Sequence, residues 1–246
     1  MKYILLLLIT LNISYAGDST IEVVKKVDSL PSLACEDSSV DYDKTFKMTF
    51  FKSIIADLNV ISIFNVDRHY NTIDYSNSDV VVNNKDMDYI LRYKLVQGDD
   101  NSLNVRMKLF SHSKVVFNKN YRIKNSKIYM FMAHTIAYDI NKFMGKPSVE
   151  WMKKKVIFSR VIKKRKTEIV IADYTLAYQH TIVKGGFNVF PKWANNKQNS
   201  FYYTSLDEIK PTLKYINMLN GSIKIIATSD GMLICSDVSS NGEKLL

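Results

Sequence analysis

The sequence reads Pro191-Lys192-Trp193-Ala194-Asn195-Asn196-Lys197 shortly before the β-type run Phe201-Tyr202-Tyr203. A related stretch, Ser236-Asp237-Val238-Ser239-Ser240-Asn241-Gly242, precedes the last strand-like residues of the chain. In both, an apolar or aromatic residue is followed by a tight polar turn and then by a strand. Trp193 and Val238 are 45 positions apart, which is about the length of one four-stranded propeller blade. The repeat therefore predicts a β-propeller in the second half of the chain.

Short β-type runs surround these two turns. Each unit has an upstream hairpin, at 168–183 in the first and 214–226 in the second, and turn residues such as Asn220-Gly221 separate the runs. About 95 residues follow residue 150, enough for roughly two blades. Two blades do not close a ring, so we interpret the sequence as the first part of a propeller, cut off after about its second blade. The predicted strands are 155–161, 168–172, 179–183, 201–204, 214–218 and 222–226.

The first half of the chain has a different pattern. Apolar residues at helical spacing predict helices over 43–58 and 128–144, and Gly145 provides a stop for the second. These helices and the strands between them predict a small mixed α/β domain over 40–147, joined near residues 146–150 to the propeller part at 151–246. The expected fold class is therefore α+β. The predicted strands are 60–64, 88–95, 103–109 and 114–123.

The N-terminus predicts export. Met1-Lys2 precedes a short apolar run over 3–13, and Ser14-Tyr15-Ala16 supplies the small residues that signal peptidase recognises. The run is shorter than the ~20 apolar residues that span a bilayer. We therefore expect a signal peptide at 1–16, cleaved between Ala16 and Gly17. Residues 17–39 are polar, have no strong period, and are expected to form a leader that need not pack tightly.

Charge and cysteine content narrow the classes of function. The net charge of +10 is compatible with nucleic acid or an anionic surface as partner. Export argues against nucleic acid, and the lysines are interleaved with Asp and Asn as on a solvated face. Cys35 and Cys235 have the spacing of neither a disulfide scaffold nor a zinc site. A long-range bridge between them in an oxidising compartment stays open, although they fall in different predicted domains.

Catalytic signatures are missing from the sequence. It contains no H-E-x-x-H, G-x-S-x-G or P-loop motif, and its four histidines have no metal-ligand spacing. We interpret His134, on the second predicted helix, as a packed or capping residue that joins helix to sheet. We therefore expect no enzymatic activity, no metal and no cofactor, and assign function to surfaces.

The order of these parts resembles the TolB family, the β-propeller proteins of the Tol–Pal envelope system. The second turn resembles the family's S-P-D-G-x-x-[IL] blade turn, and the first resembles P-x-[WF]-S-P-D with a one-residue insertion. Both turns lack the family's prolines, and Lys197 replaces the glycine of the first. Three further segments resemble family motifs: the first-blade strand at 169–174, the end-of-domain helix with Ala133-His134, Asp139 and Gly145, and the N-terminal segment at 21–31.

The resemblance implies a periplasmic scaffold with two protein partners. The leader would bind the inner-membrane protein TolA by adding a strand to its sheet, with Ile21 and Val23 on one side, Glu22 and Val24 on the other, and Lys25 at the end. Propeller loops at 184–189 and 228–233, including Asp230 and Met232, would bind the outer-membrane lipoprotein Pal. A leader that switches between docked and undocked states would couple the two partners.

The implied roles are outer-membrane integrity, envelope constriction at cell division and macromolecule import, with no small-molecule substrate. Two alternatives stay open. One is the propeller domain of a periplasmic peptidase or lyase whose catalytic part lies beyond Leu246. The other is a solute- or glycan-binding propeller with polar or aromatic residues around a central channel.

Overall fold

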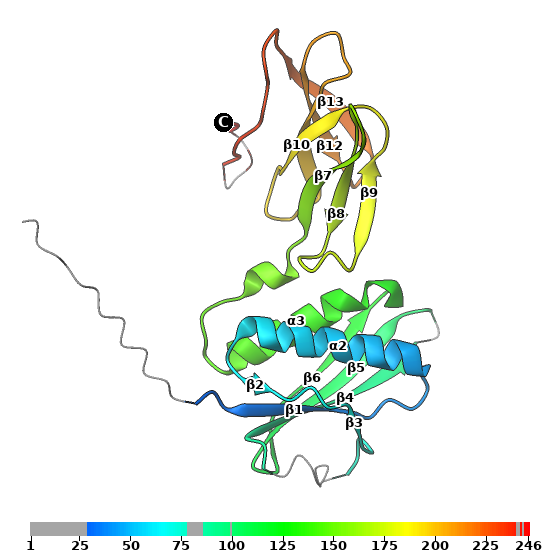
Figure 1. Cartoon of the computed structure of the whole chain (residues 1–246), viewed down its shortest axis with the longest axis vertical. Helices are drawn as coiled ribbons and strands as arrows, with labels where there is room; N and C mark the ends of the chain where they lie inside the picture. The colour runs from blue at the N-terminus through cyan, green and yellow to red at the C-terminus, as the bar shows by residue number, and fades with distance from the viewer. Residues whose placement is uncertain (1–28, 78–85, 99, 240–241, 243) are drawn as a thin grey trace, which may run out of the picture.

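A six-stranded sheet organises the first half of the chain. The computed structural model describes residues 29–246 except 78–85, 99, 240–241 and 243. The strands lie in the order β2-β1-β4-β5-β6, with β3 paired to β1, and two helices, α2 and α3, cover one face of the sheet (Figure 1). The bounds are β1 Ser32–Asp37, α2 Lys44–Ile61, β2 Asn65–Val66, β3 Asn71–Thr72, β4 Tyr89–Gln97, β5 Leu103–Ser111, β6 Lys114–Ile123 and α3 Tyr129–Phe143.

Strand β1 corrects the expectation of a loosely packed leader. It runs parallel to β4, with Leu33 opposite Tyr89, and Leu33, Ala34 and Cys35 are fully buried. The loose-packing expectation is therefore wrong for residues 32–39. A strand that is buried on both faces reads as a short continuous run instead of an alternating one. Strand β1 therefore shows no alternation in the sequence, and the polar residues on both sides of it favoured the interpretation of a loose leader.

The predicted strand at 60–64 is also wrong. Helix α2 begins after Asp43, whose carboxylate accepts the N–H of Phe46 at 3.0 Å, and it continues through Ile61. It ends at Ser62, which has a left-handed φ of 55°. Ile61 and Phe64 are both buried, one from the last helical turn and one from the loop before β2. The apolar run at 60–64 thus serves two elements and forms no strand.

The helices bury their apolar faces against the sheet. Their buried residues recur at intervals of three or four, as the helical periodicity predicts. Burying each large apolar side chain contributes roughly 1.5–3 kcal/mol, so this core is the main source of the domain's stability. The residues nearest the centre are Phe50, Ile54 and Leu58 from α2 and Ala133, Ile136 and Ile140 from α3.

An ion pair is fully buried within the same sheet. Nε and Nη2 of Arg92 on β4 lie 2.9 and 2.8 Å from Oε2 of Glu36 on β1. The guanidinium also lies 4.8 Å from the ring centroid of Phe110 and donates to the carbonyl of Asn77. Both charged side chains are 0% exposed. The strands therefore depend on this pair being complete, because an unpaired buried charge is strongly destabilising.

Two antiparallel sheets make up the second half, a three-stranded sheet β7-β8-β9 and a four-stranded sheet β10-β11-β12-β13. Ile169 of the first is buried together with Phe201 and Ile216 of the second. An α/β unit followed by propeller-type sheets confirms the expected fold class, whereas the exact division near residues 146–150 stays a prediction. The bounds are β7 Val156–Lys163, β8 Lys166–Ala172, β9 Gln179–Val183, β10 Asn188–Trp193, β11 Ser200–Ser205, β12 Thr212–Asn217 and β13 Ser222–Thr228.

The first blade turn differs in detail from the sequence interpretation. Pro191 and Trp193 lie in strand β10, and Pro191 falls in the bulge between Val189 and Lys192, a position where a strand accepts proline. The turn itself follows the strand, and Gln198 has the left-handed φ of 54°. Gln198, and not Lys197, therefore takes the place of the family's turn glycine.

The two cysteines are both free. Cys35 lies in β1 and Cys235 in the segment after β13, and both are buried. The long-range bridge left open by the sequence is therefore absent. Burial raises the pKa of both thiols, so each stays protonated and unreactive near neutral pH.

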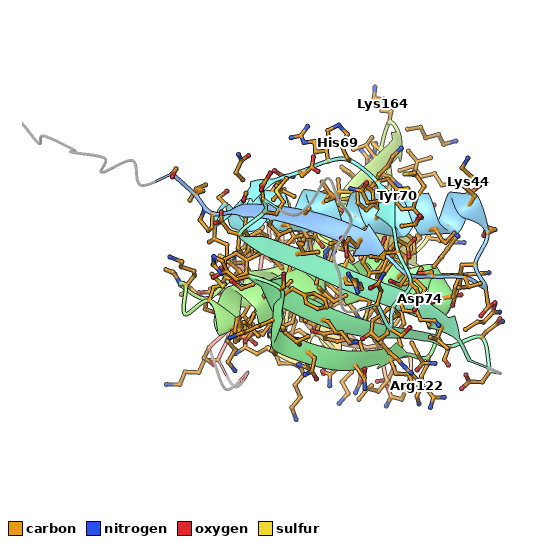
Figure 2. The ribbon with its side chains drawn as sticks, turned by 90° about the horizontal axis from the view of Figure 1, so that it is seen from below. Lys44, His69, Tyr70, Asp74, Arg122 and Lys164 are labelled. Atoms are coloured by element: carbon orange, nitrogen blue, oxygen red, sulfur yellow. The ribbon has the colours of Figure 1, made fainter. Side chains whose placement is uncertain are left out.

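Replacing Arg92 with Leu tests the buried pair. We expect Arg92→Leu to lower the free energy of unfolding by about 3–5 kcal/mol, because it removes the guanidinium that pairs with the buried carboxylate of Glu36. The matched control is Arg122→Leu in β6 (Figure 2), since Arg122 pairs with Asp100 at 2.9 Å with side chains 63% and 57% exposed. The control should lose about 1 kcal/mol or less. Urea unfolding measures both, and equal losses would contradict the assignment.

Candidate functional site

The predicted site residues fall in two regions of the chain. The cleavage site at residues 16–17 and the partner-binding segment at 21–25 lie outside the described residues, so both stay predictions. Asp230 and Met232 lie in the segment that follows β13. Strand β13 and its neighbours therefore determine where Asp230 and Met232 lie.

Strand register brings the two predicted propeller loops to one end of the four-stranded sheet. Asn188 pairs with Ser205, Ser205 with Thr212, and Thr212 with Thr228. The adjoining segments 184–187, 206–211 and 229–233 therefore lie side by side, and we call them the loop face. Figure 1 shows this end of the sheet pointing away from the α/β domain.

The loop face combines exposed apolar side chains with paired charges. Ile209 is fully exposed and Met232 is 62% exposed. Asp230 forms an ion pair with Lys210, with 2.7 Å between Oδ1 and Nζ. An apolar centre among charged side chains is the usual composition of a protein-binding surface. Asp230 and Met232 thus belong to a surface suited to a macromolecular partner.

Asp207 joins two of the three segments. Its carboxylate accepts the backbone N–H of Phe187, which links segment 206–211 to segment 184–187. Gly186 has a φ of +75°, and a Cβ there would lie 2.1 Å from Oδ2 of Asp207. The left-handed φ favours glycine at this position. Segments 184–187 and 206–211 of the loop face are therefore joined by a local contact.

Sequence reasoning missed segment 206–211 as part of this face. In an antiparallel sheet every second connection returns to the same end. The predicted strands at 201–204 and 214–218 flank the segment, so this alternation could have placed it beside the other two loops. Its only local signals are Asp207 and Pro211, which mark a turn without giving its position.

A second cluster lies where the α/β domain meets the first blade. Nδ1 of His134 on α3 lies 2.8 Å from Oδ2 of Asp57 on α2, and Nε2 lies 3.2 Å from Oδ2 of Asp173 after β8. The three side chains are at most 1% exposed. The hydroxyl of Tyr174 donates to the other oxygen of Asp57. We call these four residues the junction cluster.

Each ring nitrogen of His134 faces a carboxylate oxygen, Nδ1 that of Asp57 and Nε2 that of Asp173. Burial acts to raise the pKa of the Asp173 carboxyl, but hydrogen bonds from Thr175 and from the backbone N–H of Tyr178 outweigh it and hold this pKa below its usual value. The cluster is therefore a buried polar network that needs every partner in place.

The structure refines the interpretation of His134 as a packed residue. It joins α3 to α2 and to the propeller, through partners that are 77 and 39 positions away in the sequence. Among the described residues no group of His, Cys, Asp and Glu side chains is arranged to hold a metal ion. In the same part of the chain, none of the helices has the length and apolar character needed to cross a membrane.

Known proteins resemble this chain along its whole length. No protein-family model matches it. The Tol–Pal system protein TolB of Wolinella succinogenes is 36% identical over 254 residues, and those of Helicobacter hepaticus and Campylobacter jejuni are 36% and 35% identical over 252 and 246 residues. Each alignment covers all of this chain. The chain spans 58–59% of the length of these curated relatives. Their shared name is that of an envelope-system protein and not of an enzyme.

A solved structure agrees at the level of the fold. The crystal structure of TolB from Acinetobacter baumannii matches 87% of this chain, and the match covers 54% of that protein's chain. The TM-score is 0.64 at 13% sequence identity. The match supports the same architecture of an α/β domain followed by propeller blades.

Replacing His134 tests the junction cluster. We expect His134→Leu to lower the free energy of unfolding by about 3–5 kcal/mol, because it leaves two buried carboxylates without their shared donor. Cleavage between residues 144 and 155 in limited proteolysis should speed up as the domains separate. The matched control is His69→Leu, since His69 is 88% exposed and pairs with nearby Asp67. An unchanged cleavage rate in His134→Leu would contradict the assignment.

Proposed function

Since the chain belongs to the TolB family, we propose that it is part of a periplasmic protein-binding scaffold of the Tol–Pal system. Residues 1–16 direct its export. The leader binds the inner-membrane protein TolA, and the loop face binds the outer-membrane lipoprotein Pal. The scaffold thereby links the two membranes, in support of outer-membrane integrity, constriction at cell division and macromolecule import.

The gathering of the loop face into one surface carries the proposal. Three segments that are separate in the sequence meet at one end of a blade, and they present Ile209 and Met232 to solvent. Exposed apolar side chains beside charged ones favour association with another protein. The tie between Asp207 and Phe187 supports a preformed surface, which lowers the entropic cost of binding.

The alternation in the leader supports TolA as the second partner. Residues 21–25 place Ile21 and Val23 on one side and Glu22 and Val24 on the other. A segment of this kind adds to the edge of a sheet through backbone hydrogen bonds, and its alternate side chains enter pockets. The leader precedes β1, which begins at Ser32, so its attachment point is at the body of the α/β domain.

Deletion of residues 17–25 tests the leader. We expect this deletion to abolish binding to the TolA C-terminal domain, and Val23→Pro to weaken it at least about tenfold, the effect of roughly 1.4 kcal/mol. Proline removes a backbone donor and restricts the strand. Titration calorimetry measures both variants against purified TolA domain and Pal, and Pal binding should not change. The control Val27→Pro lies outside the alternating segment and should bind TolA normally. Wild-type affinity of both leader variants would refute the mechanism.

Paired substitutions test the loop face. We expect Ile209→Asp combined with Met232→Asp to weaken Pal binding at least about tenfold, because a desolvated apolar centre contributes most of the energy of an interface. The exposed positions make a folding defect unexpected. The matched control is Leu219→Asp, since Leu219 is 77% exposed in the turn at the opposite end of the same sheet. Equal effects of the two sets on Pal binding would place the Pal site elsewhere.

A further inference from the structure

A groove runs along the exposed side of α2, in the α/β domain and not in the propeller part that carries the loop face. Its volume is about 490 Å³. Phe51 and Ile55 form its floor, Met48 and Asn59 mark its two ends, and Tyr70 from the segment between β2 and β3 forms its wall. From Met48 to Asn59 the helix rises roughly 16 Å. The groove therefore has the length of about three helical turns.

The wall of the groove is held in place from below. The ring of Tyr70 packs edge-on against Phe51, with 5.1 Å between the ring centroids, and its hydroxyl donates to Asp37 of β1 at 2.6 Å. Figure 2 shows Tyr70 beside α2. A wall fixed by a buried strand needs no ordering when a partner docks, which favours affinity.

The rim of the groove is positively charged. Lys52 and Arg68 both line the groove and are exposed. Among the described residues neither forms an ion pair, and no acidic side chain lines the groove. Two cations beside an apolar floor complement a partner that presents apolar side chains flanked by carboxylates.

The groove fits a helix better than an extended strand. Adding a strand requires a row of free backbone N–H and C=O groups. Here the long side of the groove is α2, whose backbone groups bond within the helix, and the neighbouring strands β2 and β3 are two residues long. A helix needs only side-chain contacts, with anchors at positions i, i+3 or i+4, and i+7.

We propose that this groove docks a short acidic amphipathic helix of a partner protein. The apolar face of that helix lies on Phe51 and Ile55 and against Tyr70. Its Asp or Glu side chains pair with Lys52 and Arg68. The groove is thus a third interaction surface, separate from the two surfaces proposed above, and its test does not involve TolA or Pal.

A peptide selection tests the groove directly. A phage library of random peptides about 16 residues long, roughly four helical turns, is selected on the purified protein and then counter-selected on Lys52→Glu/Arg68→Glu. We expect enriched peptides with apolar residues spaced by three or four and with flanking Asp or Glu. Fluorescence anisotropy of an enriched peptide should show at least tenfold weaker binding to the double variant. A peptide with its acids changed to Lys should bind the double variant better than the wild type.

The control is Lys44→Glu, at the start of the same helix and outside the groove (Figure 2). It should change peptide affinity less than about twofold, because eight residues, roughly 12 Å of helix, separate it from Lys52, which exceeds the Debye length of about 8–10 Å. Four results would overturn the proposal. The enriched peptides could lack acidic residues, or no groove-dependent peptide could be enriched. Lys44→Glu could weaken binding as much as the double variant does, or deleting residues 17–25 could raise the peptide affinity tenfold. The last would identify the chain's own leader as the occupant.

Discussion

His134 makes its two hydrogen bonds to carboxylates from different parts of the fold, Asp57 on α2 and Asp173 at the end of β8. Burying these groups costs free energy unless each finds its partner. These hydrogen bonds form only when the helices and the first blade are arranged as observed, and other arrangements would leave the buried groups without them. The tilted ring contact between Tyr174 and His134, with 4.6 Å between the ring centroids, adds apolar contact to the same junction. Position and orientation of the first blade relative to the helices follow from this small network.

The junction cluster and the loop face lie at opposite ends of the propeller sheets. The turn at 173–178 contacts the α/β domain, whereas β9 leads from it to segment 184–187 on the loop face. The rows of backbone hydrogen bonds in β8 and β9 make this a stiff connection. A partner on the loop face therefore acts on a rigid body, and the groove on α2 belongs to the other side of the junction. The proposed loop face and the proposed groove therefore consist of different residues and do not overlap.

Strand β13 forms an edge of its sheet and exposes apolar side chains in the described part of the chain. It is the last strand of the four-stranded sheet, and Ile223 and Ile225 are 58% and 68% exposed. Propeller blades bury such faces against their neighbours. The contact of Ile169 with Phe201 and Ile216 between the two sheets already illustrates that packing.

Local periodicity was enough to predict most elements of this protein. Local periodicity predicts helix α3 and the hairpin of β4 and β5, because each pattern involves residues close together in the sequence. The spacing of Trp193 and Val238 predicts a blade-length repeat in the same way. The assignment of Asp230 and Met232 to a binding surface came from the family resemblance and stays a prediction. The leader residues Ile21–Lys25 also come from sequence alone, as does the resemblance to the TolB family.

Tertiary structure decided the rest, because it depends on contacts between distant residues. Strand β1 gives no alternation since both its faces are buried, and only its place between β2 and β4 explains Glu36 beside Arg92. Segment 206–211 joins the loop face through strand register. The sequence around His134 predicts only a histidine on a helix. Its two partners, Asp57 and Asp173, come from distant parts of the sequence and meet it only in the folded protein. These hydrogen bonds and ion pairs form between residues that are close in space but distant in the sequence, so no local sequence pattern predicts them.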